Sequence, residues 1–391
     1  MNPTRRRIGC ALCAGAFAAL APRALAQAVP GREFLVPGYR PSAESDEKGL
    51  WSLMDRAEEN LRQSRFVVRD AEVNAYLRAI LCRLAKDHCT DVRIYVVRTA
   101  QFNASMAPNG MMEVWTGLLL RCVDEAQLAA IIGHELGHYL RRHTVERWRD
   151  ARNKADFGAF LGLGLAIAGL GAVGSLANLA LVASAFSFSR DQEREADEIG
   201  LELMARARYA PVAAAEVWEQ LIAEFKAGTA ERSTQVLFAT HPEPEERMGT
   251  LREAAAKAGG STGDRGRERY LAALRSIRGR LVGDELALRQ YGRSELVFDR
   301  LLVQAPDDGG LWHGKGEVYR LRGGEGDPER ALEAYGRALA TGRAPPETYR
   351  AITLVELKRG ATDRARAALD QYIKAKPDAT DVEALRMLFT Q

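Results

Sequence analysis

Residues 128–140 read Leu-Ala-Ala-Ile-Ile-Gly-His-Glu-Leu-Gly-His-Tyr-Leu, and this stretch determines how the rest of the chain is interpreted. The apolar run before His134 predicts a buried helix. On such a helix His134 and His138 lie about one turn apart on the same face, so both imidazoles can reach one Zn²⁺. Glu135 follows the first histidine directly and is placed to act as the general base for a metal-bound water. The alternative is a helix with two incidental histidines, and the apolar context favours the metal site.

Composition sets broad limits on the function. The chain has 391 residues, enough for two or three domains with cores of their own. Its formal net charge is only +3, so nothing indicates a nucleic-acid-binding protein.

The N-terminus reads as a targeting signal. Three arginines at positions 5–7 precede an apolar run over residues 8–21 and the tripeptide Ala24-Leu25-Ala26. This pattern predicts a secretory signal peptide cleaved after Ala26. The arginines also fit a twin-arginine signal, and the export route stays open.

Removal of that signal would leave three cysteines, Cys82, Cys89 and Cys122. In an oxidising compartment one option is a bridge between Cys82 and Cys89, with Cys122 left over. The other option is three small buried side chains, and the sequence does not choose between the two.

Two strands are predicted before the metal-site helix, over residues 92–97 and 112–116. We expect the second strand to offer an edge on which an extended substrate peptide lies by β-addition. Glu113, Val114 and Trp115 are therefore candidate substrate-binding residues.

Residues 157–189 contain no charged side chain and are long enough to span a bilayer. Three interpretations compete: a membrane span or hairpin, a segment that touches a membrane surface, and a helical lid. Asn178, several serines and many glycines weaken a lipid-facing helix, so we favour the lid.

The C-terminal third is helical and repetitive. Trp312, Gly316 and Tyr319 match the start of a tetratricopeptide repeat, and similar units precede and follow them. An unrelated helical bundle is the alternative. The predicted organisation is a signal peptide, a metallopeptidase domain, a Gly/Ala-rich linker and a repeat domain, over residues 1–26, 27–250, 251–266 and 267–391.

A catalytic zinc needs a third protein ligand in addition to two histidines. His143 does not fit the longer metzincin motif, and on a continued helix its phase points away from the other two, so we interpret it as a surface or packing residue. A later predicted helix carries Glu193 and Asp197 one turn apart. These two suit a metal ligand and a carboxylate that accepts the free ring N–H of a ligating histidine. The alternative is a solvated charged face, which applies most strongly to Asp191, Glu195 and Glu198.

The motif His-Glu-Leu-Gly-His, followed by Ser189-Arg190, Glu193 and Ala196-Asp197, resembles the zinc metallopeptidases that include HtpX and the CAAX prenyl proteases. Further matching positions within residues 45–250 are Asn103-Ala104, Pro108, Gly110, Thr116-Gly117-Leu118, Thr240-His241-Pro242, Pro244 and Arg247. The resemblance implies that Glu193 is the third ligand. It also implies that His241 approaches the metal, either to stabilise the oxyanion or to cover the site at rest. Asn109 departs from the family, which usually has a glycine there, and this affects the local turn.

A signal peptide, this domain and the repeats together resemble the BepA-like periplasmic proteases. The resemblance implies a mostly α fold: a zincin-type helical metallopeptidase domain with a small antiparallel sheet, followed by a repeat solenoid. It implies one Zn²⁺ per chain and a periplasmic endopeptidase that cleaves misfolded or stalled envelope proteins. The outer-membrane assembly machinery is a further expected partner, and nucleic acid is not. The alternatives are a chaperone-like assembly factor with proteolysis gated off, and a membrane-embedded protease if residues 157–189 span.

Overall fold

The computed structural model describes residues 33–153, 188–228, 241 and 244–389. The predicted signal peptide and nearly all of the uncharged segment 157–189 lie outside the described residues. Within the described residues, no helix is both long and apolar enough to cross a membrane. The chain divides into a unit of residues 1–34 and a unit of residues 35–391, and the second contains all the elements described.

Three short strands form a mixed sheet in the order β1-β3-β2, with β1 Arg93–Val97, β2 Ala104–Met106 and β3 Met111–Trp115. β3 pairs in parallel with β1 and antiparallel with β2. The predicted antiparallel sheet is therefore wrong for the β1–β3 pair, because the chain passes from β1 to the far side of β3 before it returns as a hairpin.

The predicted substrate edge is also wrong. Glu113 pairs with Tyr95 on one side and Ser105 on the other, so β3 is the central strand and its backbone groups are already used. Val114 and Trp115 are buried in the same strand. The edge nearest the metal-site helix is β2, which packs against that helix.

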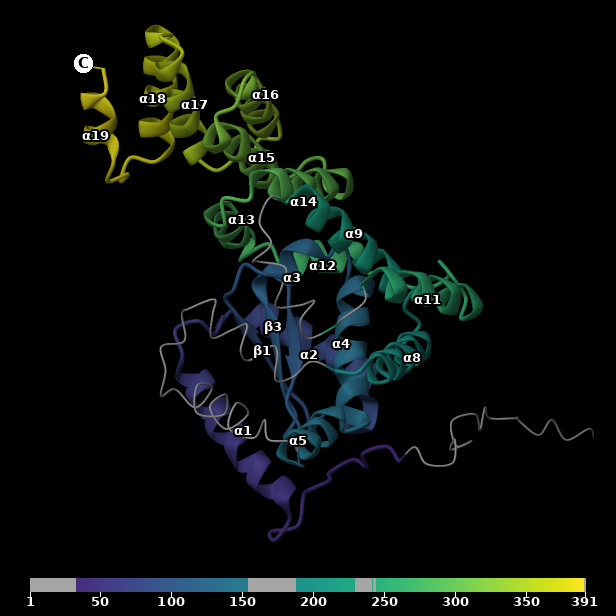
Figure 1. The fold of residues 1–391 in the computed structure, drawn as a ribbon. Helices are drawn as coiled ribbons and strands as arrows, with labels where there is room; N and C mark the ends of the chain where they lie inside the picture. The colour runs from purple at the N-terminus through teal and green to yellow at the C-terminus, as the bar shows by residue number, and fades with distance from the viewer. Residues whose placement is uncertain (1–32, 154–187, 229–240, 242–243, 390–391) are drawn as a thin grey trace, which may run out of the picture. The chain divides into compact units, whose positions relative to one another are not determined.

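The two helices that carry the motif residues are α4 (Glu125–Leu140) and α8 (Arg190–Arg206). α4 begins where the Asp124 side chain accepts a hydrogen bond from the Gln127 backbone N–H, and α8 begins with a capping box between Ser189 and Gln192. Figure 1 shows α8 alongside α4, and α4 beside the sheet.

Glycines bring α4 and α8 into backbone contact. A Cβ on Gly137 would lie 2.8 Å from the Ala196 carbonyl oxygen, and one on Gly200 would lie 3.0 Å from the His134 nitrogen. Side chains larger than hydrogen at these two positions would push the helices apart. The close approach brings the acidic face of α8 onto the histidine face of α4.

Further helices surround this pair, and the apolar faces of several of them form one core with the sheet. They are α1 Asp46–Gln63, α2 Ala71–Ala85, the 3₁₀ turn η1 Lys86–His88, α3 Thr116–Arg121, α5 His143–Asn153, α9 Ala213–Ala227 and α11 Pro244–Lys257. Leu50, Met54, Val145 and Trp148 form a separate apolar cluster.

A disulfide joins Cys82, near the end of α2, to Cys89, with their Cα atoms 4.6 Å apart. Cys122 is free and buried. Of the two options left open by the sequence, the bridge is the one present.

The remaining chain is helical to Met387, in the elements α12 Arg267–Ala273, α13 Arg278–Ala287, α14 Tyr291–Gln304, α15 Gly309–Arg322, α16 Asp327–Ala340, α17 Glu347–Lys358, α18 Thr362–Ala375 and α19 Val382–Met387. α15 packs on α16 and α17 packs on α18. Gly316 faces the ring of Tyr335, where a Cβ would lie 2.3 Å from the nearest ring carbon. The assignment of these pairs as tetratricopeptide repeats stays a prediction.

The predicted linker contacts the helices before it. α11 continues through Lys257, so the first part of the linker is helical. Arg265 then forms ion pairs with Asp124 and Glu216, both at 2.6 Å. The boundaries of the domains themselves stay a prediction.

Candidate active site

Ligand atoms from four buried side chains converge between α4 and α8. His134 and His138 come from α4, Glu193 comes from the first turn of α8, and His241 precedes α11. One atom from each side chain lies within 4.8 Å of the corresponding atom of every other. The structure therefore brings together all the residues predicted to approach the metal.

The donor set fits a tetrahedral cation. Nε2 of His134 lies 3.1 Å from Nε2 of His138 and 3.3 Å from Nδ1 of His241. Glu193 Oε1 lies 2.9 Å from that Nδ1 and 3.6 Å from the His138 Nε2. Nitrogen and oxygen ligands about 2 Å from a tetrahedral zinc would be roughly 3.3 Å apart. Three imidazoles and one carboxylate at this spacing suit a divalent transition-metal ion.

Asp197 lies where a carboxylate can orient the first histidine. Its Oδ1 is 2.9 Å from Nδ1 of His134, which leaves Nε2 of that ring for a metal. Burial alone would raise the pKa of Asp197, but Arg247 and His134 lower it below the usual range of a carboxyl group. The Asp197 carboxylate therefore stays ionised and fixes the tautomer of His134.

Arg247 is a site residue whose role sequence reasoning missed. Its Nε and Nη2 donate to the two carboxylate oxygens of Asp197 at 2.9 and 2.6 Å, and its Nη1 lies 2.6 Å from Glu193 Oε2. Its guanidinium also lies over the ring of Trp218, 4.3 Å from the centroid. The family match included Arg247, but nothing in its sequence context showed that it spans both carboxylates.

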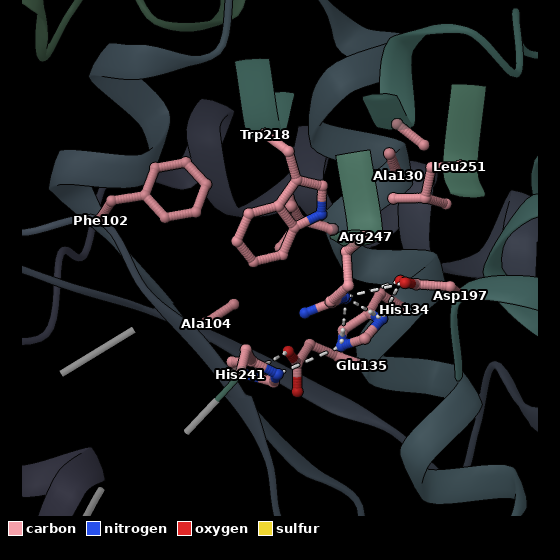
Figure 2. Close-up of a pocket in the computed structure, with 12 residues that line it drawn as sticks. Phe102, Ala104, Ala130, His134, Glu135, Asp197, Trp218, His241, Arg247 and Leu251 are labelled. Atoms are coloured by element: carbon pink, nitrogen blue, oxygen red, sulfur yellow. Dashed lines mark hydrogen bonds and ion pairs between the residues drawn. The ribbon is translucent and has the colours of Figure 1, made fainter. Parts of the chain in front are cut away.

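Glu135 faces the same site, with Oε1 3.7 Å from Nε2 of His241. Figure 2 shows Glu135 and His241 side by side beneath His134. Burial raises the pKa of Glu135 to about 7, an effect that the positive charge of His241 partly offsets. A carboxyl group with a pKa near neutrality can both accept and return a proton at physiological pH.

His143 is buried and contacts the predicted ligand His138, so the interpretation as a surface residue is wrong. Its Nδ1 lies 2.9 Å from Nδ1 of His138, and its Nε2 lies 3.1 Å from Oε2 of Glu195. His143 does not continue the helical phase of α4, because α4 ends at Leu140, Arg142 takes a left-handed conformation, φ 59°, and His143 starts a new helix.

Glu195 is not on a solvated face either. Its Oε1 accepts a hydrogen bond from Nε of Arg141 at 2.8 Å, and its other oxygen faces His143. The side chain is 13% exposed.

A small cavity adjoins His134 and Glu135 (Figure 2). Most of its wall is apolar, and Ala104 brings the edge strand β2 into it. The apolar residues that line it are Phe102, Ala104, Ala130, Ile131, Ala214, Trp218 and Leu251.

Comparison with known proteins agrees with this geometry. Residues 67–255 match the model of peptidase family M48. The chain is 28% identical to the putative beta-barrel assembly-enhancing protease of Vibrio cholerae, over 66% of this chain and 54% of that protein. It is 26% identical to the beta-barrel assembly-enhancing protease of Escherichia coli, over 83% of this chain and 60% of that protein.

A third relative is the mitochondrial metalloendopeptidase OMA1 of Schizosaccharomyces pombe, 34% identical over 46% of this chain and 52% of that protein. The matched part of this chain thus spans between about half and three-fifths of each relative. All four converging side chains and Glu135 fall inside the matched residues. Residues 67–255 of this chain are a metallopeptidase domain of peptidase family M48.

Proposed function

We propose that this protein is a zinc-dependent endopeptidase of the periplasm that cleaves misfolded or stalled envelope proteins, one zinc per chain. The observation that carries the proposal is the convergence of His134, His138 and Glu193 beside the buried Glu135. His₂Glu is a ligand set used by catalytic zinc in peptidases. The comparisons add the name metalloendopeptidase for one relative and protease for others.

In this proposal His134, His138 and Glu193 hold the ion. Bound there, zinc would supply a Lewis acid for the scissile carbonyl and lower the pKa of a water molecule. Glu135 accepts the proton of the attacking water and passes it to the leaving amine. Arg247 and Asp197 hold the ligands in place, since they connect Glu193 to His134 through two ion pairs and the charged hydrogen bond from Arg247 to Asp197.

The substrate would lie as an extended peptide along β2. This strand is at the edge of the sheet, and Ala104 lines the cavity that holds His134 and Glu135. Addition of a peptide strand here supplies backbone hydrogen bonds that do not depend on sequence. Unfolded chains offer such strands, which suits a protease of misfolded proteins. The apolar wall around Trp218 suits an apolar side chain near the scissile bond.

The proposed location and partners rest on separate observations. The Cys82–Cys89 bridge is typical of proteins in oxidising compartments, which fits the predicted signal peptide. Two relatives carry names that refer to β-barrel assembly. We therefore propose that residues 267–391 form tetratricopeptide repeats that bind substrates or the outer-membrane assembly machinery.

One observation favours the gated alternative. Nδ1 of His241 lies within the ligand cluster, 3.3 Å from His134 Nε2 and 2.9 Å from Glu193. In this position His241 would compete with a water molecule for a metal held by His134, His138 and Glu193. A chain in this state would bind partners without cleaving them, as a chaperone-like assembly factor would.

Metal removal tests the proposed chemistry. Purified protein should contain one zinc per chain, and dialysis against a chelator should abolish cleavage of casein. Addition of zinc to the dialysed protein should restore cleavage, because α4 and α8 hold the buried ligands in position even without the ion. Zinc content by elemental analysis and casein cleavage are measured on the same samples. Full cleavage by metal-free protein would refute a metallopeptidase.

Replacement of His241 by alanine tests the gate. We expect His241→Ala to retain one zinc, because His134, His138 and Glu193 remain, and to cleave casein several-fold faster than the wild type. Initial rates of casein cleavage are the measurement. If His241 instead stabilised the oxyanion, the variant would be slower than the wild type at unchanged zinc content.

A further inference from the structure

We propose that His143 and Glu195 are positioning residues for the metal ligand His138, which they orient through a directed chain of hydrogen bonds. The inference rests on the proposed zinc peptidase, since it assigns Nε2 of His138 to the metal. The contacts that carry it are His138 Nδ1 to His143 Nδ1, 2.9 Å, and His143 Nε2 to Glu195 Oε2, 3.1 Å.

Coordination chemistry determines which ring nitrogens carry protons in this series of hydrogen bonds. A neutral imidazole that binds a metal through Nε2 carries its proton on Nδ1. Nδ1–H of His138 then donates to His143, whose Nδ1 must be the unprotonated acceptor. The proton of His143 therefore lies on Nε2 and donates to the Glu195 carboxylate. Both N–H donors, on His138 and on His143, therefore point away from the metal. Each of the two rings has only one tautomer that fits these contacts.

The surroundings hold the members of the chain in place. His138 and His143 are each 1% exposed, so water does not compete for their ring nitrogens. Phe188 stacks on His138, with centroids 3.7 Å apart and ring planes 18° apart, which fixes the plane of the imidazole. Nε of Arg141 donates to Glu195 at 2.8 Å and orients the carboxylate at the end of the chain. The ring plane is thus set by Phe188 and the direction within the plane by His143.

The two histidine ligands are supported in different ways by the same helix. His134 reaches a carboxylate of α8 directly, through Asp197 at 2.9 Å. His138 reaches a carboxylate of α8 through the intervening ring of His143. The break of α4 at Arg142 makes this second arrangement possible, because it turns the chain so that His143 lies beside His138. A continuous helix would carry His143 away from His138.

Zinc affinity is the first test. His143→Phe keeps a ring of similar shape and removes both nitrogens, and we expect it to bind zinc about 10- to 100-fold more weakly, the usual effect of losing such a partner. His143→Gln, whose amide has both an acceptor and a donor, should recover part of the loss. The matched control is His313→Phe on α15, a histidine whose Nδ1 contacts Thr348 in the C-terminal helices. It should bind zinc as the wild type does. Affinities are measured on the full chain by competition with a chromophoric chelator.

Proton positions are the second test, and they do not depend on a variant that folds. Long-range ¹H–¹⁵N spectra of the zinc-loaded wild type should show neutral His143 with its proton on Nε2. A proton on Nδ1 would overturn the proposal, as would a His143→Phe variant that unfolds at the wild-type temperature and binds zinc within twofold of the wild type. A wild type that binds zinc but cleaves no peptide would refute the proposed peptidase activity. The proposed hydrogen bonds from His138 through His143 to Glu195 would not be affected. A wild type that binds no zinc would overturn both.

Discussion

Glu135→Gln is expected to lower the rate of casein cleavage by about 10²- to 10⁴-fold while the protein keeps its zinc. Glutamine has nearly the same shape as glutamate but cannot accept the proton of the attacking water. The variant leaves the four converging side chains unchanged, so binding of the metal is preserved. Initial cleavage rates and zinc content, measured on the same preparation, separate the loss of a base from the loss of the ion.

Glu202→Gln is the matched control for this experiment. Glu202 is an exposed residue of α8, so the same chemical change there should leave both cleavage and zinc content unaltered. Glu135→Gln protein that retains more than a tenth of the wild-type rate would remove Glu135 from the role of general base. Loss of zinc from this variant would instead indicate that Glu135 helps to hold the site together.

The part of the site that local spacing determines could be predicted from sequence. His134 and His138 are four residues apart on one helix, and so are Glu193 and Asp197 on another, so each pair shares a face once its helix forms. The pairing of the two faces was expected from the family resemblance, and the glycines that allow it were visible only as part of the motif. In the structure Gly137 and Gly200 permit the backbone contact that joins the faces.

The features that the sequence did not predict depend on where the chain turns between helices and strands. The strand order was missed because hairpin and crossover connections between short strands give the same local hydrophobic pattern. His143 was misjudged because a single left-handed residue, Arg142, ends one helix and begins the next. Arg247 lies more than a hundred residues from His134 along the chain, and no pattern in its own helix indicates that it reaches into the metal site.

Arg121→Met should reduce the free energy of unfolding by about 3–5 kcal/mol, the usual cost of removing one partner from a buried ion pair. Arg121 is 1% exposed, and its guanidinium lies 2.7 Å from Glu224 of α9 and 2.7 Å from Glu285 of α13. Glu224 also pairs with Arg293 and Arg300, so it would keep cationic partners. Glu285 would keep a hydrogen bond from Ser294, 2.9 Å, and the electrostatic attraction of Arg293, and a buried carboxylate that loses its direct ion pair is costly.

Arg98→Met is the matched control, because it also removes an arginine that pairs with α13. Its partner is Asp284, at 2.7 Å, but the Arg98 side chain is 50% exposed. Pairs in contact with water contribute about 0–1 kcal/mol, so the control should be close to the wild type. Urea denaturation followed by circular dichroism measures both variants, with zinc removed so that binding does not add to stability.

The urea unfolding curves of Arg121→Met and Arg98→Met also test where the peptidase domain ends. Arg121 and Glu224 lie within the residues matched by the family model, whereas Glu285 lies beyond the linker predicted at residues 251–266. If α13 and α14 unfold together with the peptidase helices, Arg121→Met shifts a single transition toward lower urea. If the C-terminal helices form an independent domain, the variant instead separates the curve into two transitions. A small and equal effect of Arg121→Met and Arg98→Met would mean that this buried cluster does not stabilise the junction. In that case residues 267–391 could be deleted to study the peptidase alone. A large loss of stability in Arg121→Met would mean that such a deletion destabilises the peptidase, because Arg121 and Glu224 would lose the partners that α13 and α14 supply.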